Sequence, residues 1–427
     1  MRGSGAARQE EACLATDDSL WKELRARVGG MEPWPVMTSW LEPSLDEQRR
    51  ILAEAGDRVV LHAERAQKLP SSPRLDAADL RHELAALEVE DPRDAIEAME
   101  LAVRLLTEGT VHTTSPSYFG LFNPTPSFMG VIGDLLAAAF NPQLAAWSHA
   151  PAANEIEAWL VRYLARHLGM TTTVGGSFTS GGAEANAQAL HLALTRAFPA
   201  FSDKGLRGLD ADPVMYASSE SHLAWLKIAH VCGIGRDAVR LVPAGPDLRM
   251  DIEAVERMIV DDQRRGRLPV LIVATAGTTS AGVIDPLEEA GEVARRHKSW
   301  YHVDAAWAGA ACLSDQLRAH LVGIDSADSV TIDAHKWLSV PMGAGIFITS
   351  NTDTLGETYR ISTSYMPTAV GNTADPYTSS TNGRVASSDS NCSSRCSRLD
   401  ARATPPSSNT TPHSATGSDH VPRTPVG

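Results

Sequence analysis

Short apolar runs and longer amphipathic stretches alternate along the middle of the chain. Four of the runs are mainly apolar or β-branched and end in small or polar residues: 214–220, 270–277, 301–304 and 329–333. Such runs predict buried strands. Between them, stretches 252–265 and 287–297 repeat apolar residues at helical spacing. Strands that alternate with helices form βαβ units, so the pattern predicts an α/β fold with a mainly parallel sheet.

Residues beside the two amphipathic stretches predict where each helix begins or ends. Asp251 has the side chain of an N-cap, and Gly266 can adopt the left-handed conformation that ends a helix. Asp285 and Pro286 predict a cap and a first-turn proline for the second helix. Both stretches therefore carry their own start signals.

Helical periodicity also occurs earlier in the chain. It covers residues 45–65 and about 92–106, and the second stretch has an apolar face made of Ile96, Met99, Val103 and Leu106. These helices pack either on their own domain or on another subunit. A further apolar stripe, in residues 155–168 before Gly169, indicates packing in the core rather than contact with a cofactor.

Length and charge narrow the range of functions. The 427 residues suffice for a large α/β domain with appendages. A formal charge of −14 disfavours nucleic acid and anionic membrane surfaces as partners. The five cysteines are too few and too scattered for a disulfide framework or a zinc site, so we expect no metal. We see neither a secretory signal nor a membrane span and expect a cytoplasmic location.

Lys336 and Asp304 carry the most chemical information. Lys336 follows the run 329–333 within the sequence DAHKW, and Asp304 ends the run 301–304 within HVDAAW. A lysine amine condenses with an aldehyde, and a carboxylate held against a pyridine nitrogen keeps that nitrogen protonated. The pair therefore indicates a Schiff-base site with a pyridinium partner. For either residue alone, an ordinary position after a strand is the better interpretation.

A small-residue segment, 175–186, precedes a strongly helical stretch that reaches Leu194. We interpret its first part as a loop. The N-terminus of the following helix would offer free backbone N–H groups and the positive end of a dipole to a phosphate. The segment is neither a P-loop nor a GxGxxG fingerprint, so ATP and NAD are not favoured. A tight turn before a helix is the alternative.

Two further strand ends supply candidate side chains. His222 follows the run 214–220 and could stack on an aromatic cofactor. Thr279 follows the run 270–277 and could hydrogen-bond a ring substituent or a substrate carboxylate. A lone histidine or threonine at a strand end is more often structural, so these two residues gain weight only beside Lys336.

Together these segments resemble the group II pyridoxal-phosphate (PLP) amino-acid decarboxylases, such as the aromatic-amino-acid and glutamate decarboxylases. The resemblance runs from about residue 117 to 367. Its most specific pieces are DAHKW at 333–337, HVDAAW at 302–307 and TSGGAE at 179–184. It implies PLP as cofactor and a large domain of fold type I, the scaffold of aspartate aminotransferase.

The resemblance assigns three residues to the chemistry. Lys336 would form the Schiff base with PLP, Asp304 would face the pyridine nitrogen, and His222 would lie over the ring. It also implies five further cofactor contacts, which are Gly182, Ala183, Thr279, Ala306 and His335.

The resemblance distributes the five contacts over three parts of the site. Gly182, Ala183 and His335 would lie near the phosphate, Ala306 beneath the ring, and Thr279 near the ring hydroxyl or the substrate carboxylate. The aromatic enzymes have a hydroxyl residue at the position of Ala183. Phosphate contact there would therefore use the backbone alone.

The resemblance also predicts the domain organisation. We expect a loosely structured tail at 1–43, an N-terminal helical segment at 44–110 and the PLP-binding large domain at 111–355. Residues 356–381 would begin the mobile loop and the connection to a small C-terminal domain. That domain is largely missing here, because residues 382–427 are rich in Ser, Thr, Pro, Asn, Asp and Arg, a composition that predicts a disordered tail.

The genetic code suggests an origin for this tail. If the serines in residues 381–393 use TCN codons, reading from the third base of the Thr381 codon permits Gln-Trp-Ser-Arg-Arg-Phe-Ile-Gly-Leu-Lys-Leu-Phe. That string resembles the family's continuation beyond the mobile loop. We therefore interpret residues 382–427 as an out-of-frame translation of a normal small domain. Codon degeneracy allows other strings, so a genuine disordered tail is the alternative.

These observations predict a PLP-dependent carboxy-lyase that converts an L-amino acid into the amine and CO₂ through a Schiff base at Lys336. The resemblance also implies a homodimer with the site at the subunit interface. Two alternatives stay open. One is another PLP reaction on the same scaffold, by a C–C lyase, an aldehyde synthase or an aminotransferase. The other is a truncated PLP-binding protein without activity.

Overall fold

The computed structural model describes residues 43–73, 76–87, 93–121, 124–170, 173–361 and 375–381. The tail predicted at 382–427 lies outside the described residues, as do residues 1–42 and 362–374. The chain divides into two compact units between Tyr118 and Phe119.

The first unit is helical. Its α-helices are α3 (Leu45–Arg65), α4 (Ala77–Ala85) and α5 (Ala95–Gly109). Each helix begins at a side-chain cap, because Ser44, Asp76 and Asp94 accept hydrogen bonds from backbone N–H groups of the first turn. The predicted helices at 45–65 and about 92–106 are therefore confirmed, and the cap at Asp94 sets the start of α5.

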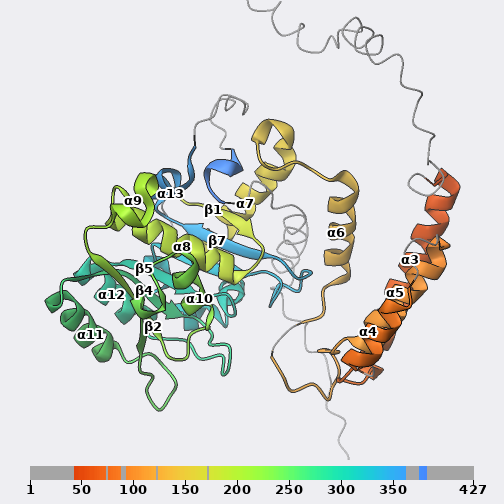
Figure 1. Ribbon diagram of the computed structural model, residues 1–427, viewed down its shortest axis with the longest axis horizontal. Coiled ribbons are helices and arrows are strands. Elements are labelled where there is room, and N and C mark those ends of the chain that lie inside the picture. The colour runs from red at the N-terminus through yellow and green to blue at the C-terminus, as the bar shows by residue number, and fades with distance from the viewer. Residues whose placement is uncertain are drawn as a thin grey trace, which may run out of the picture. The chain divides into compact units, whose positions relative to one another are not determined.

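The second unit is built on a sheet whose described strands have the order β1-β7-β6-β5-β4-β2-β3 (Figure 1). The strands are β1 (Gly175–Thr179), β2 (Asp212–Ser218), β3 (Val239–Val242), β4 (Arg267–Thr275), β5 (Trp300–Asp304), β6 (Ser329–Asp333) and β7 (Gly345–Thr349). Strand β7 runs antiparallel to β1 and β6, and the other neighbours pair in parallel. The prediction of a mainly parallel sheet is thus confirmed.

Strand β1 corrects the sequence interpretation. We expected a loop at the start of the segment 175–186, but Gly175–Thr179 pairs with β7 along its whole length. At Gly176 (φ 155°) an added Cβ would collide with the carbonyl oxygen of Phe347. The small residues that suggested a loop instead allow two backbones to approach closely.

Helices cover both faces of the sheet. Those of the second unit are α6 (Phe128–Phe140), α7 (Pro151–His167), α8 (Gly182–Ala197), α9 (Phe201–Lys204), α10 (Ala224–Val231), α11 (Ile252–Arg264), α12 (Leu287–His297) and α13 (Thr352–Tyr359). Helices α7, α11 and α12 pack on one face, and α8, α10 and α13 pack on the other. None of the described helices is long and apolar enough to cross a membrane.

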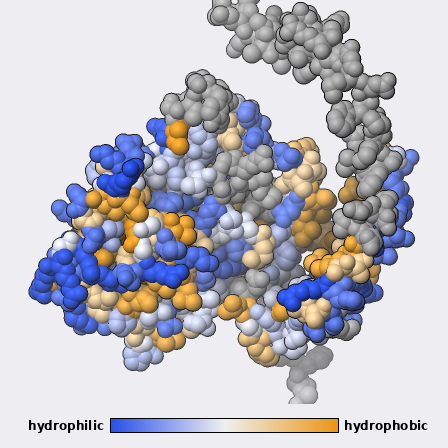
Figure 2. Space-filling view, viewed as in Figure 1, coloured by the Kyte–Doolittle hydropathy of each residue, from blue (hydrophilic) through white to orange (hydrophobic). Residues whose placement is uncertain are grey.

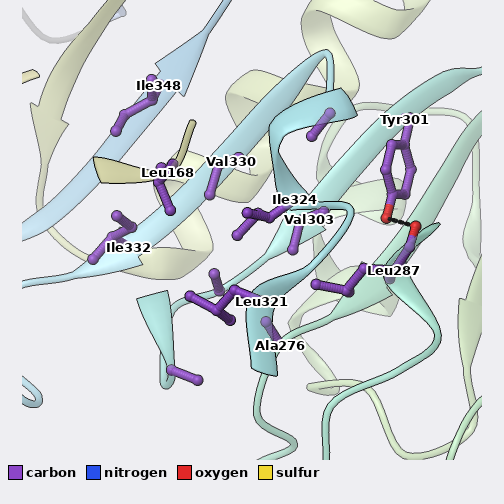
Figure 3. Close-up of a cluster of buried hydrophobic side chains, with 14 of the residues drawn as sticks. Leu168, Ala276, Leu287, Tyr301, Val303, Leu321, Ile324, Val330, Ile332 and Ile348 are labelled. Carbon is purple, nitrogen blue, oxygen red and sulfur yellow. Dashed lines mark hydrogen bonds between the residues drawn. The ribbon is translucent and has the colours of Figure 1, made fainter. Parts of the chain in front are cut away.

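The core lies in two apolar clusters separated by the sheet. Successive residues of β2 point to opposite sides, so Val214 joins the cluster under α7, α11 and α12, whereas Met215 joins the cluster under α8. Figure 3 shows part of the first cluster, where the Tyr301 hydroxyl donates a hydrogen bond to the carbonyl oxygen of Leu287. Helix α12 is thereby tied to the neighbouring strand β5.

The two predicted helix starts had different outcomes. The Asp251 carboxylate accepts from Ala254 N–H at 2.9 Å, which confirms the cap on α11. The predicted cap at Asp285 is wrong, because its carboxylate accepts instead from the backbone N–H groups of Met250 and Thr275, each at 2.8 Å. Burial raises the pKa of Asp285. This aspartate therefore joins two other segments and leaves α12 without a side-chain cap.

Candidate active site

The carboxyl ends of β2, β4, β5 and β6 meet the N-terminus of α8 around one cavity of about 80 Å³. Parallel α/β sheets place their ligand sites at this edge. Seven of the eight residues predicted from the sequence line the cavity: Gly182, Ala183, His222, Thr279, Asp304, Ala306 and Lys336. The fold therefore brings together residues that lie up to 154 positions apart in the sequence.

Lys336 projects from the turn that follows β6. Its backbone N–H donates to the carbonyl oxygen of Asp333 at 3.1 Å, and its Nζ lies 3.0 Å from Oδ2 of the same residue. Asp333 is buried, and its other oxygen, Oδ1, has no hydrogen-bond partner among the described residues. A buried carboxylate oxygen without a partner is costly, so this corner of the cavity has capacity for a polar ligand.

Sequence reasoning did not select Asp333 as a site residue. A signal was present, because Asp333 ends β6 as Asp304 ends β5, and both strands run in the same direction. The two carboxylates consequently reach the same cavity.

His335 does not line the cavity, unlike the other predicted site residues. Its Nδ1 accepts the backbone N–H of Ala344 at 3.2 Å, and its Nε2 lies 3.6 Å from Oδ2 of Asp333. Burial holds the pKa of His335 below its ordinary value. The histidine therefore lies next to Asp333 rather than at the wall of the cavity.

Asp304 is held firmly at the end of β5. Its side chain is buried, Oδ1 accepts from Ala306 N–H at 3.2 Å, and Oδ2 accepts from Nδ2 of Asn186 at 2.8 Å. Asn186 also lines the cavity, although no local pattern in the sequence singles it out. Because it lies one turn beyond Gly182 on α8, the helix that begins at the cavity also fixes the aspartate.

The start of α8 is shaped for close approach. A Cβ at Gly182 would lie 3.1 Å from both the Ala306 Cβ and the Asp333 Oδ2, so only glycine leaves this space open. The helix N-terminus directs backbone N–H groups and a positive dipole end toward the cavity. Ser180 strengthens the turn, because its N–H and hydroxyl both donate to Glu184 Oε2, at 2.8 and 2.7 Å.

His222 and Thr279 stand at the mouth of the cavity. Both residues are exposed, and Nδ1 of His222 accepts the backbone N–H of Ala224 at 3.1 Å. Behind them, the hydroxyls of Ser221 and Thr275 lie 2.8 Å apart and join the ends of β2 and β4. The mouth therefore opens to solvent between two fixed strand ends.

Two wider clefts, of about 940 and 660 Å³, lie elsewhere on the second unit. They are lined largely by exposed or half-buried side chains of both charges, including Arg295 and Glu292 in the first and Arg249 and Glu289 in the second. The smaller cavity instead gathers an amine and two buried carboxylates. Its chemistry, rather than its volume, makes it the candidate active site.

Comparison with known proteins agrees with this geometry. The sequence profile described as the pyridoxal-dependent decarboxylase conserved domain matches residues 80–379. The chain belongs to this family. The resemblance found in the sequence is thereby confirmed, and PLP is the cofactor of the pyridoxal-dependent decarboxylases.

Two relatives in the pyridoxal-dependent decarboxylase family show the extent of the similarity. The aromatic-L-amino-acid decarboxylase of Bacillus atrophaeus is 30% identical over 331 residues, which are 77% of this chain and 67% of that protein. Tryptophan decarboxylase 2 of Oryza sativa subsp. japonica is 34% identical over 310 residues, which are 70% of this chain and 61% of that protein. The chain thus spans less than two thirds of the rice relative.

A solved structure confirms the fold type. The crystal structure of Oryza sativa TDC with PLP and tryptamine superposes with a TM-score of 0.77 at 25% identity, over 84% of this chain and 77% of that one. The large domain of this family member therefore has the fold-type-I architecture predicted from the sequence.

The residues around the cavity fit PLP. A primary amine at Lys336 suits the aldehyde, a buried carboxylate at Asp304 suits a protonated ring nitrogen, and the N-terminus of α8 suits a phosphate. The open space at Gly182, which a Cβ would fill, leaves room for a bound group at the start of α8.

Proposed function

We propose that this chain binds PLP at Lys336 and decarboxylates an L-amino acid to the corresponding amine and CO₂. The observation that carries the proposal is the meeting of the Lys336 amine and the Asp304 carboxylate in one cavity. When bound, PLP supplies an electron sink for the electron pair that remains when the substrate's carboxylate leaves as CO₂.

The chain's own residues hold and orient the reacting groups. Lys336 would bind the aldehyde carbon, and in the cofactor-free chain its amine is paired with Asp333. Asp304 would accept a hydrogen bond from the ring nitrogen and keep the proton there. Gly182 and Ala183 would bind the phosphate through backbone N–H groups, since neither has a side-chain donor.

The mouth of the cavity has the remaining roles. His222 would cover the exposed face of the ring and keep water from the reacting carbon, while Ala306 would support the opposite face; both residues line the cavity. Thr279 offers a hydroxyl to the ring hydroxyl or the substrate carboxylate. Because Thr279 and His222 follow different strands, both positions depend on the register of β2 with β4.

We propose a homodimer as the working form. Its support is the apolar surface of α6, where Phe128, Leu136 and Phe140 are 57%, 51% and 81% exposed. Figure 2 shows apolar surface, in orange, in the region of α6. A large exposed apolar patch is typical of a protein interface. Sedimentation with PLP tests the proposal, and a strictly monomeric protein that binds PLP tightly would contradict it.

The cytoplasmic location stays a prediction of the sequence.

One experiment separates the proposed function from its alternatives. The purified chain is incubated with PLP, its visible absorption is recorded, and a panel of amino acids is scored for CO₂, amine and aldehyde. Borohydride reduction followed by peptide mapping should place the pyridoxyl group on Lys336, and Lys336→Ala should remove both the label and the CO₂.

The products distinguish the proposed decarboxylase from its alternatives. Amine with equal CO₂ supports the decarboxylase, and aldehyde in place of amine favours an aldehyde synthase. An absorption band without any product indicates a PLP-binding protein without activity. A label on another lysine, or none on a folded protein, would refute the assignment of Lys336.

A further inference from the structure

Five buried side chains form a continuous chain of hydrogen bonds that ends at Asp304. Trp300 Nε1 lies 2.8 Å from Ser329 Oγ, which lies 2.8 Å from His302 Nδ1. His302 Nε2 lies 3.0 Å from Asn186 Oδ1, and Asn186 Nδ2 lies 2.8 Å from Asp304 Oδ2. All five side chains are at most 4% exposed, so water does not substitute for any of these bonds.

The chain arises from the alternation of side chains along a strand. Trp300, His302 and Asp304 occupy every second position of β5 and therefore point to the same face. Ser329 lies opposite His302 on β6, and α8 crosses this face with Asn186 over Asp304. Strand β5 thus carries the first, third and last side chains of this hydrogen-bonded series.

The direction of each hydrogen bond follows from the groups at the two ends of the series, Asp304 and Trp300. The Asp304 carboxylate, when ionised, only accepts, so Asn186 must donate with Nδ2 and present Oδ1 to the histidine. The opposite amide orientation would place two oxygen acceptors against each other. His302 must therefore carry a proton on Nε2 to donate to Asn186.

The other ring nitrogen completes the assignment. Burial lowers the pKa of His302 to about 4, so the ring is neutral near neutral pH and Nδ1 is an acceptor. The Ser329 hydroxyl then donates to Nδ1, while its oxygen accepts from Trp300, whose indole nitrogen only donates. Every hydrogen in the chain consequently points toward Asp304.

The neighbours of His302 leave this assignment intact. The edge of the Trp225 ring system packs against it at 5.6 Å between centroids, and Thr331 Oγ1 lies 3.4 Å from Nε2, where it can accept a share of the same proton. The charge of Asp304 and a backbone hydrogen bond at Ser329 both raise the pKa of His302, and burial outweighs them. Within the described residues, no lysine or arginine forms an ion pair with Asp304.

We propose that His302 and Asn186 are positioning residues that orient Asp304 and hold it as the anion required by a protonated pyridine nitrogen. Neutral dipoles aligned in one direction stabilise a buried carboxylate through hydrogen bonding and mutual polarisation. They do so without a permanent cation, which would compete with the ring nitrogen for the same carboxylate. The proposal rests on the proposed PLP site for its purpose, but the direction of the hydrogen bonds can be tested without cofactor or activity.

The first test measures the tautomer of His302. The full chain is labelled with ¹⁵N-histidine, its ring resonances are recorded by NMR, and His302→Gln identifies the signal that belongs to position 302. We expect a neutral ring with the proton on Nε2. This state should not change between about pH 6 and pH 8, the range in which an ordinary histidine titrates. A proton on Nδ1, or an ordinary titration, would overturn the proposal.

The second test reads the ring nitrogen itself. PLP labelled with ¹⁵N at the pyridine position is added to wild type and to Asn186→Asp, which keeps the shape of the side chain but removes the donor. We expect the variant to lose the signal of the protonated pyridine nitrogen. Its Kd for PLP should rise at least about tenfold. Gln188→Glu is the matched control, because Gln188 is a buried amide on the same helix that pairs with Ser177 instead.

Two histidine variants guard against a purely structural effect. Glutamine can place an N–H donor near the Nε2 position, so His302→Gln should retain the protonated-nitrogen signal that His302→Leu loses. Retention of that signal in both Asn186→Asp and His302→Leu would refute the positioning role. If wild type takes up no PLP, the proposed function fails, whereas the tautomer measurement still decides the direction of the chain.

Discussion

The Nζ of Lys336 lies 3.0 Å from the Oδ2 of Asp333, three residues earlier at the end of β6. The carboxylate is 5% exposed and the amine 25%, so the pair is shielded but the amine still reaches the cavity. An amine that binds the cofactor gives up this partner. Asp333 therefore acts as the counter-ion of the cofactor-free protein, close to the helix start that would hold the phosphate.

Asp333→Asn should bind PLP more tightly than wild type. The change removes both the ion pair that competes for Lys336 and a negative charge beside the phosphate. We expect the Kd for PLP to fall about tenfold, which corresponds to about 1.4 kcal/mol. Absorbance titration measures it, with the exposed Asp325→Asn as control. Weaker binding would show that the carboxylate instead assists the amine.

Asp304→Asn should retain PLP but slow the reaction strongly. The amide cannot stabilise a protonated ring nitrogen as a carboxylate does, so the electron sink weakens. A loss of about 4 kcal/mol in the barrier corresponds to roughly a thousandfold lower kcat. Turnover by an active form of the chain checks this, and a rate near that of wild type would exclude the role.

The stability of the second unit should fall in mild acid because His302 is buried and neutral. Its pKa is lowered from 6.5 to about 4 by burial, so as the pH falls the unfolded chain takes up a proton before the folded chain does. The contribution is complete above pH 6.5 and is lost as the pH falls toward 4.

Urea unfolding can measure this contribution. Between about pH 7 and pH 5 it should cost about 2 kcal/mol, and a His302→Gln variant should lose this part of the pH dependence. If the free energy of unfolding of the variant falls by the same amount over this pH range, groups other than His302 cause the effect.

A second buried carboxylate should govern the stability of the opposite edge of the sheet. Asp262 accepts from the Tyr216 hydroxyl at 3.0 Å, Arg240 Nε at 2.9 Å and Arg267 Nη1 at 2.9 Å. Burial alone would raise the pKa of Asp262, but these three donors outweigh it and hold the pKa below its ordinary value.

Removing these donors should have graded effects on the free energy of unfolding. We expect Arg240→Met to cost about 3 kcal/mol, because it leaves a buried charge partly unpaired, and Tyr216→Phe about 1.5 kcal/mol. The exposed Arg257→Met should cost less than about 0.5 kcal/mol, although Arg257 also contacts two carboxylates. Equal effects of the three changes in urea unfolding would contradict this account.

The reading frame after Thr381 gives the remaining prediction. We expect the coding DNA to contain a small domain in the alternative frame, and a chain translated in that frame to be longer and more active than the present one. Sequencing of the DNA is the measurement. If the alternative frame encodes no small domain, the out-of-frame interpretation ends and the tail at 382–427 stands as a real sequence.

Local patterns predicted the strand ends well, because the residues that carry the chemistry follow apolar runs. Lys336 and Asp304 could be paired from sequence, since Asp304 ends β5 and Lys336 follows the end of the parallel strand β6, and such ends meet at one edge. Asn186 and His302 could not be selected in this way. Their importance depends on α8 crossing β5 at one register, which is a tertiary relation with no local signal.

Two errors have the same physical origin. The glycines of β1 were interpreted as a loop because glycine is uncommon in strands, whereas here Gly176 permits close pairing with β7. Asp285 was interpreted as a helix cap because aspartate before a helix usually caps it, but two distant N–H groups bind its carboxylate. In both cases long-range pairing outweighed a local preference.

The position of β7 constrains the order in which the protein can form during synthesis. Strand β1 leaves the ribosome first, yet its partner in the described sheet is β7, the last strand to emerge. Until Gly345–Thr349 is synthesised, β1 and one edge of β6 remain unpaired, and strands of other chains can pair with them. Nascent chains that stall before β7 should therefore be the species most dependent on chaperones, whatever follows residue 381.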